Sequence, residues 1–436
     1  MDLNNSTRSV FRYFSEFVNL PRHILFAAFA ISAAASFLLF GYEFIRAVSE
    51  SLFIAAYTAE NLPRVMAAVL PGLLLLLYIY GRLLSWLGAT RTLAITSVLS
   101  GVLILGTYIA LLNGIDFAAA IIYVFREAYI VIVLEQFWSF VNSTLTTKQA
   151  KTINGPFCAI ASVGSVVGGL LVNRWAETLG SETLLLFTTA SLIPAAIFGV
   201  IAYNLAGEPK PAVAEEGGRR GHLGVKTLFS SRYLVFIGLL ILSTQVISTV
   251  LVIRFDGLVE KEILNTDTMT AYFGKFYAGL AAIAAVLQLI VVPIALRFVS
   301  IRIIHIGIPI VHLVNGLILT LTPSLRAGSR AFLMFKALDY SLFRAGKELF
   351  YMPLSYDERY RAKQIIDSFL YRSGKSGSAS VIALIGVVVK TIPGAVYSIA
   401  AMVASCVWSG LVLNLTSQYQ KIEKTDKNVD NNTDIV

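Results

Sequence analysis

Long apolar segments recur along the whole chain, and short polar stretches separate them. A helix needs about 20 apolar residues to cross a hydrocarbon core of about 30 Å. No segment alternates in polarity as the strands of a membrane barrel do. The pattern predicts an all-α integral membrane protein with about twelve transmembrane helices. These are expected at residues 24–48, 65–84, 92–113, 117–144, 153–174, 183–206, 232–257, 271–297, 301–323, 328–352, 364–391 and 393–415.

The longest polar interruption, residues 207–231, lies in the middle of the chain and is rich in proline, glycine and both charges, so it is predicted to be a linker. It would join an N-terminal six-helix half, 1–206, to a C-terminal six-helix half, 232–420, with a tail at 421–436. Two such halves are typical of the major facilitator fold, in which parallel repeats enclose a binding site near the bilayer midplane.

Composition and charge agree with a membrane protein and predict its orientation. Charged residues are 14% of the chain, against about 25% in soluble domains. Lysine and arginine concentrate at the N-terminus, in alternate loops, including 353–363, and in the tail, and such loops face the cytoplasm. We therefore predict a bacterial inner-membrane protein with both termini cytoplasmic. We also expect it to be monomeric. The net charge of +9 arises mostly from this bias and does not indicate nucleic-acid binding.

Several kinds of chemistry are not expected. Cys158 and Cys406 both lie in predicted spans, so no disulfide framework is predicted. Gly374 to Ser376 match the end of the phosphate-binding loop motif. However, the motif requires a glycine five residues earlier, where this chain has Phe369, and no strand is predicted before it. We predict no enzyme, no catalytic residue, no cofactor and no metal site. Four histidines are not spaced as a ligand set: His23, His222, His305 and His312.

Charged side chains inside predicted spans cost several kcal/mol unless they are paired or face water. They concentrate in the first, fourth, tenth and eleventh predicted helices. In the last two, cations outnumber acids: Lys336, Arg344, Lys347, Arg372 and Lys375 against Asp339, Glu348 and Asp367. The surplus favours an anionic ligand over purely structural pairing.

The spacing supports two interpretations, which stay open. Lys336, Tyr340, Arg344 and Lys347 fall on one face of a regular helix, as a cationic surface for an anion would. However, Arg46 is also spaced to pair with Glu43 and Glu50 on its own helix, and Arg344 with Glu348.

Residues 336–378 resemble the signature of the ATP/ADP translocases, the nucleotide transporter family of plastids and intracellular bacteria. A looser similarity covers 137–157 and 42–50. The family pattern matches in order at Tyr340 to Phe343, Lys347, Glu348, Pro353, Leu354, Lys363, Ile366, Asp367 and Gly374 to Gly377.

The resemblance implies a divergent member of the family. Ser49 stands where the family has a lysine linked to nucleotide transport, and Val250 to Val252 where it has a glutamate. The acidic position of the fourth helix falls on Arg126 or Glu127, and Arg344-Ala345 replaces Asp-Pro.

Together, the charges and the resemblance predict a secondary transporter of nucleotides or a related anionic metabolite, working by alternating access and exchange. Alternatives are a carrier of another organic anion or metabolite conjugate, including an exporter, and a non-transporting membrane scaffold. The predicted partners are this small anion and the lipid bilayer. The residues predicted to bind substrate are Lys375, Lys347, Arg46, Arg126, Lys336, Arg344 and Tyr340. Those predicted to couple transport or pair charge are Glu127, Glu348 and Asp367.

Overall fold

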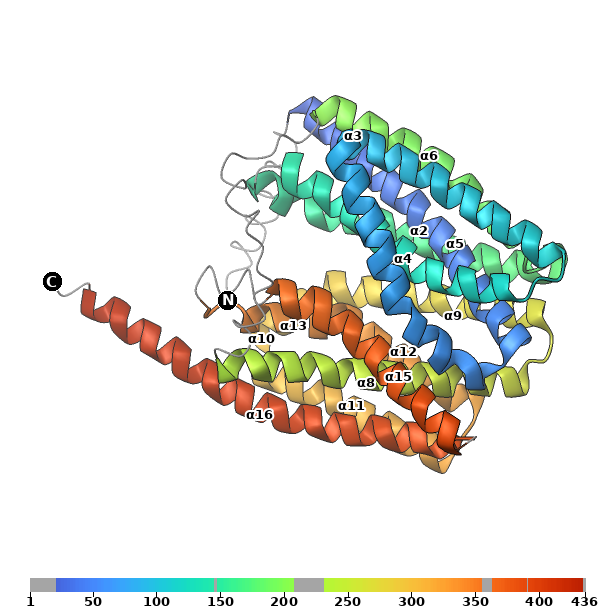
Figure 1. The fold of residues 1–436 in the computed structure, drawn as a ribbon. Coiled ribbons are helices and arrows are strands. Elements are labelled where there is room, and N and C mark those ends of the chain that lie inside the picture. Colours follow the sequence, from blue (N-terminus) through green and yellow to red (C-terminus); the bar gives the residue numbers. More distant parts are fainter. Residues whose placement is uncertain (1–20, 145–146, 208–230, 355–362, 390, 434–436) are drawn as a thin grey trace. The chain divides into compact units, whose positions relative to one another are not determined.

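The computed structural model describes residues 21–144, 147–207, 231–354, 363–389 and 391–433. All regular secondary structure in these ranges is helical, which confirms the predicted all-α class (Figure 1). The helices are α2 (Arg22–Tyr57), α3 (Leu62–Leu112), α4 (Phe117–Thr144), α5 (Thr147–Leu179), α6 (Leu184–Ala206), α8 (Arg232–Glu262), α9 (Thr266–Val286), α10 (Val292–Phe298), α11 (Ile301–Leu321), α12 (Leu325–Leu338), α13 (Arg344–Phe350), α15 (Tyr371–Val389) and α16 (Gly394–Thr433).

Each predicted span coincides with helical structure, but the spans are not all separate or uniformly apolar. Within the described ranges, nine helical segments are long and apolar enough to cross a membrane. Residues 65–84 and 92–113 share the long helix α3, which is broken at Gly88. There φ is 76° and ψ is 176°, a backbone conformation that glycine adopts far more readily than other residues. The described parts of the predicted spans 328–352 and 364–391 are largely helical, but they are not among the nine.

In the described parts of the chain, three π-helical turns interrupt the regular helices. They lie at Leu287–Val291, between α9 and α10, at Asp339–Phe343, between α12 and α13, and at Gln364–Leu370, before α15. Such turns are rare and occur frequently at functional sites. Two of the three lie in the charged segment that sequence analysis singled out.

The chain forms two compact units. Unit 1 comprises Met1–Ala56, Pro71–Glu215 and Asn265–Ala282, and unit 2 comprises Tyr57–Leu70, Glu216–Leu264 and Ile283–Val436. Most of the predicted linker, from 208 to 230, lies outside the described residues. The assignment of the chain to two six-helix halves therefore stays a prediction.

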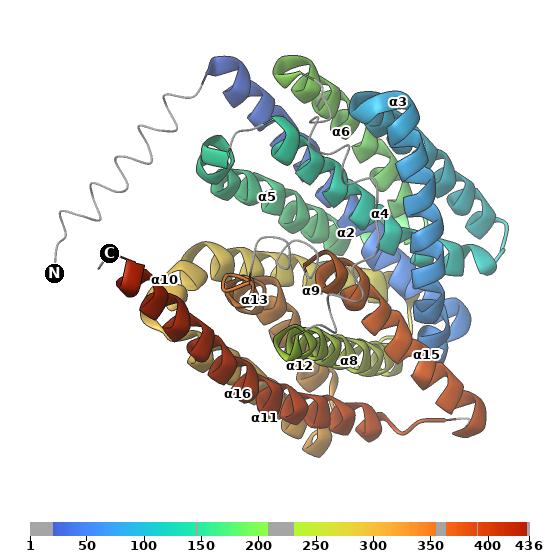
Figure 2. The ribbon, with the colours of Figure 1, turned by 60° about the vertical axis from the view of Figure 1, so that its left-hand side comes forward.

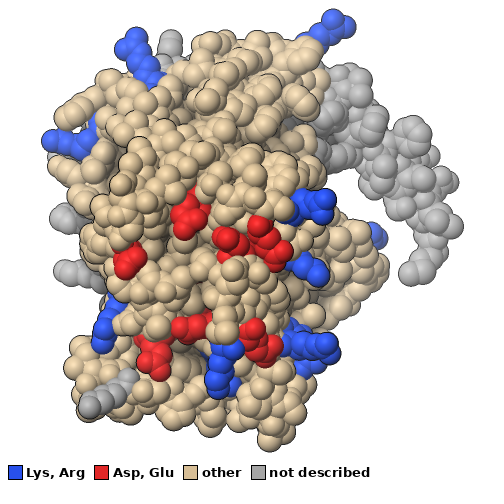
Figure 3. All heavy atoms as spheres, turned by 90° about the vertical axis from the view of Figure 1, so that its right-hand side faces the viewer, with Lys and Arg blue, Asp and Glu red and all other residues tan. Residues whose placement is uncertain are grey.

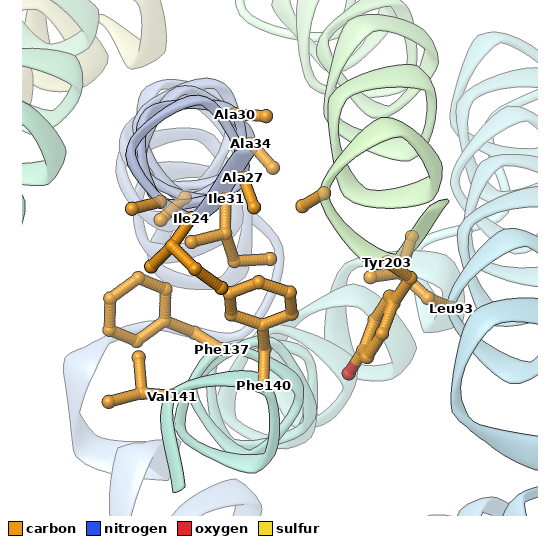
Figure 4. Packing of buried hydrophobic residues seen from close by; sticks show 13 residues of the cluster. Ile24, Ala27, Ala30, Ile31, Ala34, Leu93, Phe137, Phe140, Val141 and Tyr203 are labelled. Carbon is orange, nitrogen blue, oxygen red and sulfur yellow. The ribbon is translucent and has the colours of Figure 1, made fainter. Parts of the chain in front are cut away.

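In unit 1, small residues on α2 let neighbouring helices approach closely. Ala27 and Ala34 belong to a buried apolar cluster in which Ile24 and Ile31, also of α2, lie beside Phe137 and Phe140 of α4 (Figure 4). On the α5 side, a side chain at Gly168 would overlap the backbone of Phe40. Close backbone contact of this kind is how helices associate in lipid.

In unit 2, α16 runs along both α8 and α11 (Figure 2). Its Trp408 is fully buried, with ring centroids 5.7 Å from His312 of α11 and 4.9 Å from Phe343. Helices α12 and α15 also pack on α8. The central position of α8 brings Lys336 of α12 and Lys375 of α15 close to its polar side chains Ser248 and Thr249.

Candidate functional site

Unit 1 contains a buried ionic cluster, here called the Arg126 cluster, formed by α2, α4 and α9. Arg126 Nη1 donates to the Arg46 carbonyl at 2.7 Å, to Ser49 Oγ at 3.1 Å and to Glu50 Oε2 at 3.1 Å. The hydroxyl of Tyr277 donates to the same Glu50 oxygen at 2.6 Å. One carboxylate therefore ties three helices together.

Arg46 has a different environment from the one that its spacing predicts. Its guanidinium lies 3.5 Å from the centroid of the Tyr277 ring, a cation–π contact. Glu43 lies 3.9 Å away, as expected, but Glu50 is bound by Arg126. The structure therefore pairs Arg46 with Glu43, whereas Glu50 is bound by Arg126 from another helix.

Glu127 lies at the edge of the Arg126 cluster. Its Oε1 is 3.8 Å from Arg126 Nε, and 22% of its side chain is exposed. Glu127 is thus the more accessible carboxylate of the cluster, since the Glu50 side chain is 1% exposed.

Unit 2 contains a second ionic cluster, here called the Lys347 cluster. Lys347 Nζ lies 2.6 Å from Asp367 Oδ1, and the hydroxyl of Tyr351 donates to the same oxygen at 3.1 Å. Glu348 is 3.9 Å from Lys347 and only 2.6 Å from Lys363. The structure thus brings together Lys347, Glu348 and Asp367, which the sequence predicted as site residues.

Lys336 is buried, with 9% of the residue exposed, and faces hydroxyl and aromatic groups. Its Nζ donates to Ser248 Oγ of α8 at 2.9 Å. It also lies 5.6–5.8 Å from the ring centroids of Phe332, Phe335 and Tyr340. Within the described ranges, no carboxylate is paired with this ammonium group.

The predicted single face of Lys336, Tyr340, Arg344 and Lys347 is interrupted by the π-helical turn Asp339–Phe343. A π turn acts as one inserted residue, so residues beyond it are rotated by about 100° from their places in a regular helix. The prediction assumed an unbroken helix, whereas the structure has a π turn within it. Arg344 still lies 5.7 Å from the Tyr340 ring, and it is exposed.

Lys375 lies on α15 at a tightly packed point, as its small neighbours predict. A side chain at Gly374 would touch Gln245 of α8 at 3.0 Å. Ser376 is buried and donates to the Met66 carbonyl at 3.1 Å. Lys375 is half-buried, and its own carbonyl accepts from Thr249 at 3.4 Å. The backbone around this lysine is therefore fixed from two sides.

Sequence analysis missed three of the polar groups that complete these clusters. Tyr277, Ser248 and Tyr351 are uncharged polar residues that sequence analysis did not select as site residues. Their partners come from other helices or from beyond a turn, so only the fold could reveal them. Among the described residues, no group of three or more histidine, cysteine or acidic side chains could hold a metal ion.

Comparison with known proteins gives a consistent picture. Residues 314–419 match the family model described as TLC ATP/ADP transporter. The chain is 25% identical over 282 residues to ADP,ATP carrier protein 1 of Rickettsia conorii, covering 56% of each protein. It is 23% identical over 314 residues to ADP,ATP carrier protein 1 of Chlamydia muridarum, covering 62% of the chain and 59% of the carrier. The matches to these two carriers thus span little more than half of the carriers' length.

Solved structures show the same fold at low sequence identity. A POT family transporter, PepTSo, has a TM-score of 0.63 and 12% identity over 92% of this chain and 99% of its own. A major facilitator superfamily proton:xylose symporter has a TM-score of 0.56 and 13% identity over 91% and 96%. The chain therefore has a major-facilitator-like fold, and its predicted resemblance to the ATP/ADP translocases is confirmed.

Proposed function

We propose that the protein is a secondary transporter that exchanges nucleotides or related anionic metabolites across a membrane by alternating access. The observation that carries the proposal is Lys336, a buried ammonium with no described carboxylate partner, in the segment that matches the TLC ATP/ADP transporter model. No covalent step is proposed.

The physical basis is the cost of an unpaired cation in an apolar interior. Burying an ammonium without a counter-charge costs several kcal/mol, and an entering phosphate or carboxylate removes much of that cost. The rings of Phe332 and Tyr340 beside Lys336 suit an anion that also carries a planar group. Conversion between the inward-open and outward-open states of the transporter would then be easier with the anion bound than without it.

The other predicted residues have proposed roles around Lys336. Lys347, Lys375, Arg344 and Tyr340 of unit 2 would contact the anion. Asp367 and Glu348, which contact Lys347 at 2.6 and 3.9 Å, would hold this cation until substrate displaces them.

In unit 1, Arg46 and Arg126 are proposed as further counter-charges. Arg126 donates to Ser49, the position at which the family pattern has lysine. A cation from α4 would thus stand in for the missing lysine of α2. Glu127, the accessible acid beside Arg126, is the proposed coupling group.

The relatives' names support nucleotides as the substrate, since both are ADP,ATP carrier proteins. The test is uptake of radiolabelled ATP into proteoliposomes that are preloaded with ADP. We expect uptake that needs internal ADP and is lost in Lys336→Gln and Lys375→Gln. Lys363→Gln is the matched control, because the side chain of this lysine is 47% exposed. Wild-type uptake by both variants would contradict the assigned roles.

A carrier of another organic anion, or of a metabolite conjugate, is the second candidate. The departures at Ser49 and Val250 to Val252 favour a changed substrate. A thermal-shift panel of nucleotides and organic acids would separate the two, because specific binding raises Tm. A response to organic acids alone would favour the second candidate, and no response to any solute would favour a scaffold.

The proposed orientation places both termini and the loops around positions 215 and 358 on the cytoplasmic side of a bacterial inner membrane. These positions lie outside the described residues. Single cysteines at each position, in a chain lacking Cys158 and Cys406, should react with an impermeant thiol reagent only after lysis. Labelling of intact cells would contradict this topology.

A further inference from the structure

Unit 2 has a cavity of about 540 Å³ at the C-terminal end of α8. It is lined by the beginning of α3, the end of α8, the end of α15 and residues at the beginning of α16. The opposite end of α8 bonds to α13, where Tyr233 donates to the Phe350 carbonyl at 2.8 Å. Arg254, in the cavity wall, is about 20 residues further along α8, roughly 30 Å away. The cavity is therefore separate from the Lys347 cluster.

Two of the five charged groups around this cavity already have a structural role. Glu260 accepts from the Ala59 backbone N–H at 3.0 Å, and Arg64 donates to Asn61 Oδ1 at 2.8 Å. The remaining charged groups of the wall are Glu60, Lys261 and Arg254. The wall thus has three basic and two acidic side chains. Figure 3, which views the side at which α8 ends, shows basic and acidic side chains on that face.

Arg254 differs from the other basic groups of the wall. Its Nε is buried without a hydrogen-bond partner, and within the described ranges no carboxylate is paired with it. A guanidinium presents five donors in a plane that matches a phosphate or carboxylate. Its position in the wall leaves those donors available to a molecule in the cavity.

The first residue of α16 lies against this guanidinium. A side-chain carbon placed on Gly394 would overlap Arg254 Nη1, so only glycine leaves room for the arginine here. The first turn of α16 has no acidic residue. Because the N-terminus of a helix carries a partial positive charge, two positive groups face the same space. An anion lying between them would interact favourably with both.

We propose that this cavity is a second anion site, which binds a phosphate-bearing molecule between Arg254 and the N-terminal backbone amides of α16. The volume is typical of small-molecule sites and exceeds the needs of a single phosphate. A free organic phosphate and the headgroup of an anionic lipid share this chemistry. The site does not depend on the proposed transport, because none of its residues belongs to the Lys347 cluster.

The experiment uses full-length protein in lipid-free detergent, with inorganic pyrophosphate as the first probe and phosphatidylglycerol as the second. The apparent affinity is obtained from the rise in Tm with probe concentration. Every titration is repeated in a Lys336→Gln background, so that binding at the proposed transport site does not contribute.

Arg254→Gln should weaken binding by about tenfold or more, because a charge-assisted contact is lost. Gly394→Ala should also weaken it, since the new methyl group displaces the guanidinium while the charge is kept. The matched control is Arg326→Gln, an exposed arginine on α12 at the same end of the unit, where Glu262 accepts from the Leu325 N–H at 2.9 Å. Binding by this control should equal that of the parent protein.

Each outcome either supports or overturns the proposed anion site. A response to pyrophosphate with this pattern of variants supports a soluble phosphate compound as the ligand. A response to phosphatidylglycerol alone, with the same pattern, supports a lipid headgroup at the same site. The proposal is overturned if neither probe raises Tm, if Arg254→Gln and Gly394→Ala bind normally, or if Arg326→Gln weakens binding equally. Tm without probe shows whether each variant is folded.

Discussion

The Arg126 cluster of unit 1 and the cations of unit 2 are built from similar residues, yet their counter-charges differ. In unit 1, Arg126 has Glu50 at 3.1 Å and Arg46 has Glu43 at 3.9 Å. In unit 2, Lys347 has Asp367 at 2.6 Å, whereas Lys336 has a serine hydroxyl and three aromatic rings.

A count of the charges in a membrane span therefore does not reveal their function. A buried cation with a bonded carboxylate is held in place, and removing it strands the acid. A buried cation with only dipolar and aromatic neighbours still lacks a counter-charge, which an anionic ligand can supply. Stability should therefore depend mainly on the Arg126 cluster, and anion affinity mainly on Lys336.

The largest expected effect is that of Arg126→Gln. It leaves the Glu50 carboxylate buried without its cation, and breaking such a pair typically costs about 3–5 kcal/mol. We expect a large fall in Tm of the purified protein. The double variant Arg126→Gln with Glu50→Gln should recover much of this loss. An unchanged Tm for Arg126→Gln would mean that this arginine acts mainly as a ligand group.

Lys347→Gln should have the next largest effect. It strands Asp367, but the acid is 21% exposed and keeps its bond to Tyr351, so water and the hydroxyl compensate in part. The expected loss is about 1–2 kcal/mol. Adding Asp367→Asn should restore Tm, whereas adding the same change to Lys375→Gln should restore nothing. Rescue of Lys375→Gln instead would identify Lys375 as the main partner of Asp367.

Lys336→Gln tests the cation of unit 2 that has no described carboxylate partner. The amide can keep the hydrogen bond to Ser248, and no described carboxylate is stranded, so Tm without ligand should change little. Affinity for a nucleotide should fall about tenfold or more, roughly 1.4 kcal/mol. Isothermal titration of ATP into parent and variant measures this. A large fall in Tm with unchanged affinity would make Lys336 structural.

Lys363→Gln should have the smallest effect. Lys363 and Glu348 lie 2.6 Å apart, but their side chains are 47% and 42% exposed, and surface ion pairs contribute about 0–1 kcal/mol. Both Tm and uptake should stay close to those of the parent protein. Loss of uptake would show that Glu348 needs this partner and that the Lys347 cluster extends to the surface.

The fold class was predictable because membrane helices are long and apolar, and length and hydrophobicity are local properties of a sequence. The family signature around Lys347 could also be recognised from the sequence, since its residues lie within one continuous segment. The contacts between Arg126 and Glu50 and between Arg254 and Gly394 were not. Each joins residues on different helices, and no spacing along the chain indicates which helices pack together.

The π-helical turn Asp339–Phe343 has a consequence for how this site can change. The direction in which a side chain leaves a helix depends on its position in the sequence, and this turn inserts one extra residue between Lys336 and Lys347. Deleting a single residue here would rotate one lysine relative to the other by about 100° without altering either of them. No substitution at the two lysines could do the same. The relative orientation of these cations is thus encoded in the length of the segment between them, so insertions and deletions there would alter the site more than most replacements.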